Sequence, residues 1–439
     1  MNRNRIHRLV QRTAALALAA LLSPEAAAAQ TAIPAPAPPI TIDALVAEAL
    51  ERSPELGFYR AEIAAARGQQ LTSGGHTNPD LSGAIGQKRV SQGPAISDGL
   101  VWSVSVKQTF EWPGRISLRK AIANQDVKLA ELGLDQFRAA LSSRARTLAF
   151  NLFAAQEEAA VAREVAERFQ SLREVLVQRD SAGLTPVLET RIIEATELTF
   201  HRKATEAALA VEAARLELNQ LRGQPWEQPI SVAAPNLAFQ AFPGAEPLLA
   251  AARASNFEIR MRQAEIEQQG FRVSLARNEK KPTLTVSPYI TQENAVDRET
   301  QFGIGLSIPL SLWNRGDGKV ATEEARRLQA ETSLQVAQRN LERQVVEKGL
   351  AYQTRLAEMA RWRPDSVAKF KQAAALADRH YRLGAVPIAT YVELQKQYLE
   401  AVDALLSTRR EALEAAQELQ RLTGVELTQL PAAKPEAQK

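Results

Sequence analysis

The stretch from Trp112 to Pro186 constrains the fold of this chain more than any other. Between Arg115 and Ala182 it contains no Pro and a single Gly, Gly133. About 65 residues of helix would reach roughly 95–100 Å, so this helix needs partner helices along its length. Its apolar residues recur in steps of three and four, the period of a coiled-coil seam: Phe137, Leu141, Ala145, Leu148, Leu152, Ala155, Ala159, Ala162, Ala166, Phe169, Leu172 and Leu176.

An internal repeat supplies a twin for this helix. Gly114 corresponds to Gly316, and Gly183 corresponds to Gly384, at a nearly constant offset. We expect the twin to run from about Gly316 to Leu383, and each repeat to hold helices, a β-hairpin, a long helix and a return helix. The chain is then expected to comprise a signal peptide (1–29), a Pro-rich lead-in (30–40), repeat 1 (41–223), a Pro-rich connector (224–245), repeat 2 (246–428) and a disordered tail (429–439).

The first residues are typical of a secretory signal peptide. Four Arg precede a short apolar core, and Ala27-Ala-Ala29 offers small residues for cleavage. Removing residues 1–29 takes four Arg and one Glu from the formal net charge of +4. The mature chain is therefore nearly neutral, which excludes a general nucleic-acid-binding role. The absence of Cys excludes disulfides, thiolate chemistry and a lipid-modified cysteine.

Two segments alternate apolar and polar residues as β-strands with one apolar face do. In repeat 1 the alternation runs from Leu100 to Trp112, after a partner strand from Pro79 to Val90 and a loop from Ser91 to Gly99. In repeat 2 it runs from Phe302 to Leu312, and the partner strand begins at Leu284. The residues expected on the apolar, lipid-facing side are Leu100, Trp102, Val104, Val106, Phe302, Ile304, Leu306 and Ile308.

These strands admit two interpretations. One is a soluble sandwich or a sheet that caps the helices. The other is a transmembrane barrel, because the strands have the required length and Trp102, Trp112 and Trp313 lie on or at the ends of the apolar strands. Four strands cannot close a useful barrel, and an open edge is not tolerated in lipid. Three subunits would supply twelve strands, so the expected fold is mainly α, with a trimeric twelve-stranded membrane β-barrel passing into an α-helical periplasmic tunnel.

Taken together, these features resemble the TolC-like outer-membrane efflux channels, and the resemblance covers about residues 41–428. Two motifs, Phe110-Glu-Trp-Pro-Gly-Arg115 and Ile308-Pro-Leu-Ser-Leu-Trp-Asn-Arg-Gly-Asp-Gly318, resemble the branch that serves heavy-metal efflux, of the cobalt–zinc–cadmium type. The resemblance implies a homotrimer in the outer membrane. It also implies docking to a periplasmic adaptor (a membrane fusion protein) and to an inner-membrane pump of the RND class.

The same resemblance implies roles for particular residues. The adaptor is expected to dock on the two hairpin tips, Gly183, Leu184 and Thr185 in repeat 1 and Gly384, Ala385 and Val386 in repeat 2. The periplasmic gate and entrance correspond to Glu189, Tyr381, Thr390 and Glu393. Related channels carry a second carboxylate where Thr390 stands and a basic gate partner where Val386 stands. Three Glu393 side chains around a threefold axis would attract cations.

We expect neither an enzyme nor a bound cofactor or metal. The four His show no ligand spacing, Met occurs only three times, and no phosphate loop, nucleophile elbow or metalloprotease helix is found. The expected function is a passive exit duct. Two alternatives stay open: a channel of the same fold that exports drugs or secreted polypeptides, and a soluble periplasmic adaptor or coiled-coil scaffold. The alternating strands favour the channel over the adaptor.

Overall fold

The computed structural model describes residues 39–92, 95–180, 187–295, 297–363 and 365–429, which fall within one compact unit, Pro38–Lys439. The expected signal peptide and the first tip (Gly183, Leu184 and Thr185) lie outside the described residues. So does most of the expected lead-in and tail, although Gln429 of that tail pairs in a strand.

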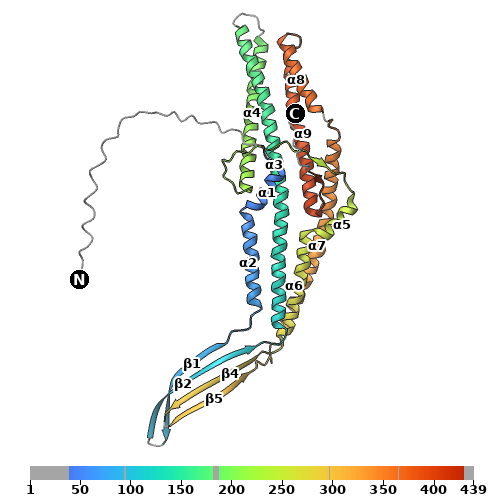
Figure 1. Cartoon of the computed structure of the whole chain (residues 1–439). Helices are drawn as coiled ribbons and strands as arrows, with labels where there is room; N and C mark the ends of the chain where they lie inside the picture. The colour runs from blue at the N-terminus through green and yellow to red at the C-terminus, as the bar shows by residue number, and fades with distance from the viewer. Residues whose placement is uncertain (1–38, 93–94, 181–186, 296, 364, 430–439) are drawn as a thin grey trace, which may run out of the picture. The chain divides into compact units, whose positions relative to one another are not determined.

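The two repeats follow the same order of elements, except that repeat 2 has two helices, α7 and α8, where repeat 1 has the single helix α3 (Figure 1). Repeat 1 holds α1 (Ile42–Arg52), α2 (Glu55–Ser73), β1 (Asp80–Gln92), β2 (Ala95–Phe110), α3 (Arg115–Asp180) and α4 (Val187–Leu221). Repeat 2 holds α5 (Ala245–Ser255), α6 (Phe257–Glu279), β4 (Leu284–Asn294), β5 (Arg298–Ser307), α7 (Asp317–Met359), α8 (Ser366–Arg382) and α9 (Ile388–Thr423). A small sheet pairs β3 (Ala238–Phe239) in the connector with β6 (Thr428–Gln429) after α9.

The long helix predicted after Trp112 is confirmed, because α3 runs unbroken for 66 residues. The predicted twin is wrong in one respect. It is split into α7 and α8, and turn hydrogen bonds from Arg361 and Trp362 follow the end of α7. The sequence has Pro364 in this interval, and a Pro removes a helical N–H and disfavours helical geometry at the residue before it.

The four longer strands form one antiparallel sheet in the order β1-β2-β4-β5, so the two hairpins meet through β2 and β4. The predicted loop from Ser91 to Gly99 is wrong in extent. Its flanks continue the ladder, with Ser91 opposite Ile96 and Gln92 opposite Ala95. The last predicted strand is also too long, because β5 ends at Ser307, two residues before Pro309, whose missing N–H cannot continue a ladder.

Two apolar clusters hold the helices together. The larger contains buried residues from α1, α2, α3, α4, α8 and α9, and the smaller contains residues from α5, α6, α7 and α9. Helix α9 therefore contributes to both clusters. Among the described residues, no helix combines the length and the apolar content needed to cross a bilayer.

Candidate functional site

The four-stranded sheet has one apolar face and one polar face. Residues opposite each other in an antiparallel ladder share a face, and Gly83, Val104, Ile290 and Phe302 lie opposite one another across the four strands. The neighbouring row, Ser82, Ser105, Tyr289 and Gly303, lies on the other face. The predicted apolar residues Leu100, Trp102, Val104, Val106, Phe302, Ile304 and Leu306 therefore share one face, joined by Leu81, Ile85, Phe110 and Leu284. Ile308, predicted within the strand, lies just beyond the end of β5.

This apolar face is exposed in the single chain. Phe302, Ile304 and Leu306 are 76%, 71% and 70% exposed, and Leu81 and Ile85 on β1 are exposed to a similar degree. A contiguous apolar surface of this kind marks a contact with a membrane or with another protein. The outer edges of β1 and β5 carry no ladder partner among the described residues, so the sheet is open on both sides.

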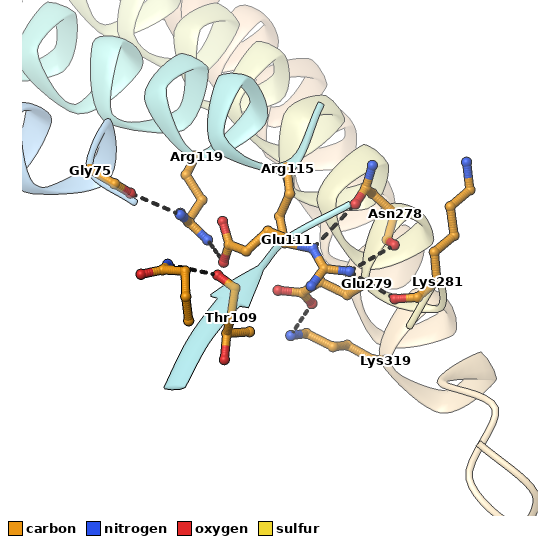
Figure 2. A network of polar contacts seen from close by, with 10 residues as sticks. Gly75, Thr109, Glu111, Arg115, Arg119, Asn278, Glu279, Lys281 and Lys319 are labelled. Atoms are coloured by element: carbon orange, nitrogen blue, oxygen red, sulfur yellow. Dashed lines mark hydrogen bonds and ion pairs between the residues drawn. The ribbon is translucent and has the colours of Figure 1, made fainter. Parts of the chain in front are cut away.

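Arg115 ties the sheet–helix junction of repeat 1 to repeat 2. The side chain is 7% exposed and donates to the Asn278 carbonyl (3.1 Å), the Asn278 side-chain oxygen (3.2 Å) and the Lys281 carbonyl (2.9 Å). Asn278 in turn donates to the Pro113 carbonyl at 3.0 Å. Figure 2 shows the guanidinium aimed at these groups at the end of α6. The Trp-Pro-Gly-Arg motif thus caps a helix of the other repeat, where the last carbonyls lack helical partners.

The second motif builds the equivalent junction in repeat 2. Gly316 adopts φ +78°, and its N–H donates to the Asn314 side-chain oxygen at 3.0 Å before α7 begins. Lys280 pairs with Asp317 at 2.6 Å, and Lys319 pairs with Glu279. The Lys281 ammonium lies 5.1 Å from the centre of the Trp112 ring, within the range of a cation–π contact. Both sequence motifs therefore mark the points where strands turn into helices.

The second hairpin tip is a tight Schellman turn. Gly384 has φ +74°, its N–H donates to the Tyr381 carbonyl (2.9 Å), and the Ala385 N–H donates to the His380 carbonyl (2.8 Å). A Cβ at Gly384 would meet no atom within 4 Å, so its left-handed backbone alone requires glycine. Leu383 and Ala385 are exposed and Val386 is half-buried, which leaves a small apolar tip facing outward.

The predicted gate residues have different surroundings. Tyr381 stacks on Tyr391 with ring centres 5.3 Å apart and planes 15° apart. Thr390 and Glu393 are exposed and lie one turn apart on α9, and Glu393 accepts a hydrogen bond from Gln397 at 2.9 Å. Glu189 is half-buried in the first turn of α4. Thr390 and Glu393 thus share a helix face, while Tyr381 belongs to an aromatic cluster.

That aromatic cluster was missed from the sequence. The Phe169 ring lies 4.9 Å from Phe200 and 5.1 Å from Tyr391, so α3, α4, α8 and α9 meet there through one set of rings that includes Tyr381. Burial raises the pKa of the Tyr391 hydroxyl, and the Asp378 carboxylate raises it further. The ring therefore stays neutral throughout the physiological range. The apolar seam of α3 included Phe169, but nothing in the sequence indicated its partner in repeat 2.

A polar layer accompanies these rings. Arg168 on α3 donates to the Gln395 side chain on α9 at 3.1 Å, and fully buried Gln395 donates to the Ala374 carbonyl on α8 at 2.8 Å. Glu164 on α3 accepts from Arg168 and pairs with Lys371 on α8 at 3.4 Å. The α8–α9 hairpin is thus held against α3 by both aromatic and polar contacts.

Among the described residues, no group of three or more His, Cys, Asp or Glu is placed to hold a metal ion. The features that stand out are an apolar sheet face, two fixed junctions and an exposed tip. These features suit contacts with lipid and with other proteins.

Comparison with known proteins agrees with this arrangement. Residues 248–425 match the outer membrane efflux protein family. The match covers nearly all of repeat 2, and repeat 1 has the same order of elements with α3 in place of α7 and α8. No curated protein sequence matches the chain.

Solved structures share the fold over most of the chain. CusC, described in terms of folding and transmembrane channel formation, aligns with a TM-score of 0.69 at 15% identity, covering 87% of this chain and 92% of that one. A membrane protein from Pseudomonas aeruginosa aligns with a TM-score of 0.71 at 18% identity, covering 87% and 93%. The CmeC outer membrane channel of Campylobacter jejuni aligns with a TM-score of 0.69 at 16% identity, covering 87% and 85%. At these identities the likeness establishes the fold alone.

Proposed function

We propose that this chain is an outer-membrane efflux channel, a passive exit duct with no enzymatic activity. The observation that carries the proposal is the exposed apolar face of the sheet, backed by a polar face and continuous through two junctions with long helices. Apolar-out and polar-in alternation is what a strand between lipid and an aqueous lumen requires. The match to the outer membrane efflux protein family and the shared fold of solved channels support the same conclusion.

The working form is a homotrimer. The open edges at β1 and β5 must be paired before the sheet enters lipid, and pairing β1 of one copy with β5 of the next closes a ring. Three copies give twelve strands, within the range of known barrels. The helices also expose large apolar side chains that another copy would cover: Leu198 and Leu209 on α4, and Leu328 and Leu350 on α7. These helices then form the wall of a periplasmic tunnel.

The roles of the tips and of the gate residues depend on this proposed trimer. The tips around Gly183 and Gly384 dock a periplasmic adaptor, which connects the duct to an RND pump in the inner membrane. Glu189, Tyr381, Thr390 and Glu393 line or close the periplasmic entrance. The stacking of Tyr381 on Tyr391 and the exposure of Glu393 support these roles.

The proposed cargo is a heavy-metal cation of the cobalt, zinc or cadmium type. The two junction motifs are the observations behind it, together with the exposed Glu393, which in a trimer would present three carboxylates to an entering cation. Deleting the gene and comparing tolerance to zinc, cobalt and cadmium with tolerance to detergents and dyes tests the cargo. Loss of tolerance to detergents and dyes alone would assign the duct to drugs instead.

Cell fractionation tests the class of protein. We expect the chain in the detergent-extracted outer membrane, as a trimer. Recovery in the soluble periplasmic fraction would contradict the channel and favour an adaptor or coiled-coil scaffold.

A further inference from the structure

One surface near the sheet–helix junction combines aromatic, apolar and cationic side chains. We call it the junction patch and define it as Trp112, Lys281, Leu312, Trp313 and Arg315. Trp313 is 94% exposed and Leu312 is 64% exposed, although both would be expected to avoid water. The apolar row of β5 leads toward this patch through exposed Ile308 and Leu310.

The two segments that contribute Lys281 and Arg315 to the patch carry more cations than carboxylates. Residues 279–281 and 315–319 contain four cationic side chains, Lys280, Lys281, Arg315 and Lys319, against two carboxylates, Glu279 and Asp317. The ion pairs Lys280–Asp317 and Lys319–Glu279 use both carboxylates. Lys281 and Arg315 are exposed and form no ion pair among the described residues.

The two segments lie side by side and are held in place. A Cβ on Gly316 would meet the Lys280 side chain at 3.2 Å, so the residues around 280 and 316 adjoin. Arg115 donates to the Lys281 carbonyl (Figure 2). The Lys281 ammonium lies over the Trp112 ring, so this cation is held close to the junction. Arg315 also acts on its neighbour Asp317. The pKa of the Asp317 carboxyl is lowered mainly by Lys280 and, to a lesser extent, by the positive charge of Arg315.

The opposite end of the sheet is different. There, Lys88 pairs with Glu293, and Arg89 pairs with Asp98 at 2.7 Å. Lys88 and Arg89 are thus each paired with a carboxylate of the same chain, whereas Lys281 and Arg315 of the junction patch form no ion pair among the described residues.

We propose that the junction patch binds the phosphate headgroups of anionic phospholipids in the leaflet that surrounds the base of the sheet. This inference rests on the proposed function, because it places the apolar face in a membrane. Exposed Trp beside cations at the end of an apolar band is the pattern of a membrane–water interface. Lys281 and Arg315 supply the charge that attracts anionic lipid, and Trp112 and Trp313 sit at the level of the headgroups.

Reconstitution of the full chain into vesicles tests this proposal. The vesicles contain phosphatidylcholine alone or phosphatidylcholine with phosphatidylglycerol, and native mass spectrometry counts the phosphatidylglycerol retained per chain. The double variant Lys281→Gln/Arg315→Gln is expected to lose affinity for phosphatidylglycerol by about fivefold per cation, or roughly 1 kcal/mol each. Raised salt should weaken the wild type in the same direction.

The matched control is Arg343→Gln/Lys396→Gln, which removes two exposed cations from α7 and α9, each in an ion pair within its own helix. It should leave lipid retention unchanged. Inorganic phosphate should not displace the lipid, since the two Trp contacts require the membrane interface. Competition by inorganic phosphate, or equal retention in the two double variants, would overturn the inference.

The same assay separates this inference from the proposed function. Insertion into both kinds of vesicle without preference for phosphatidylglycerol overturns the lipid inference alone. Failure to insert into any vesicle overturns both.

Discussion

At the scale of single residues, Arg115 is the side chain that most directly joins the two repeats. Its buried guanidinium satisfies two carbonyls at the end of α6 and one side-chain oxygen. Lysine at this position would keep the charge but lose the planar fork that reaches three acceptors. The contacts span more than 160 positions of sequence, so the motif alone could not disclose them.

We predict that Arg115→Lys lowers the free energy of unfolding by about 2–3 kcal/mol, because hydrogen bonds from a charged donor to buried acceptors are lost. Thermal unfolding of the detergent-solubilised protein measures this. The control is Arg277→Lys, whose exposed side chain pairs with Glu324, and which should cost below about 1 kcal/mol. Equal effects would mean that Arg115 acts as an ordinary surface cation.

Gly384 offers a second residue-scale prediction. Replacing it with Val forces a β-branched side chain into the left-handed region at φ +74°, at a cost of roughly 1–2 kcal/mol. Efflux should fall while the trimer stays in the membrane, since the tip lies far along the chain from the sheet. Gly384→Asn should retain most activity because Asn tolerates this backbone. Efflux is measured as tolerance to the exported compound. Unchanged tolerance in the Gly384→Val variant would contradict the docking role of Gly384.

At the scale of elements, a helix or strand could be predicted from the sequence where the residues that cause it lie within that element. Helix α3 was predictable because its uninterrupted seam and lack of Pro lie within the segment itself. The split between α7 and α8 was not predicted, because the twin helix was inferred from its correspondence with repeat 1 and the effect of Pro364 was not considered. The extent of β1 and β2 was misjudged because their Gly- and Ser-containing ends are held by cross-strand pairing and not by propensity.

The same distinction between local and distant causes applies to the tip and the gate. Gly384 was identified as a turn because the turn chemistry is local. The aromatic cluster joins Phe169 to Tyr391 across the two repeats, and no spacing in either helix specifies that partnership. Glu189, Thr390 and Glu393 came from a resemblance, so their roles stay predictions.

The stack of Tyr381 on Tyr391 predicts a change in conductance. Tyr381→Ala should remove the ring that joins α8 to the aromatic cluster and raise the single-channel conductance in a planar bilayer. Tyr381→Phe keeps the ring and should behave like the wild type. An unaltered conductance in the Ala variant would count against Tyr381 as a gate residue.

The packing of α3 against α9 predicts a pH dependence. Burial, together with the Asp403 carboxylate, raises the pKa of Glu158, while Arg410 opposes the shift. Because the folded chain holds this proton more tightly than the unfolded chain, the stability it contributes is lost as the pH rises through the raised pKa. Glu158→Gln should therefore raise the thermal midpoint at neutral pH but not below about pH 4, where the carboxyl is protonated in both states. Glu157→Gln, at the exposed neighbouring position, is the control; a wild-type-like midpoint for Glu158→Gln at neutral pH would contradict the prediction.

At the scale of the whole molecule, the proposed channel depends on the apolar face of the sheet to place it in the membrane. Ile304→Arg puts a charge on the apolar face and should cost about 2–4 kcal/mol in a bilayer, depending on depth. Gln301→Arg puts the same charge on the polar face of the same strand. We expect the first variant to be depleted from the outer membrane and the second to be recovered there, as measured by fractionation. Equal recovery would mean that this face does not meet lipid.

The open edges at β1 and β5 have a consequence for the order of events during biogenesis. In the proposed channel, a chain that completed its sheet in water would expose an apolar face and two unpaired strand edges, which promote aggregation. The helical part has its own apolar clusters and does not depend on the sheet for them. Helices can therefore fold early, while the strands must wait for their neighbours. Maturation is then concentration-dependent at its last step, and a chaperone that shields hairpins in transit would set its rate.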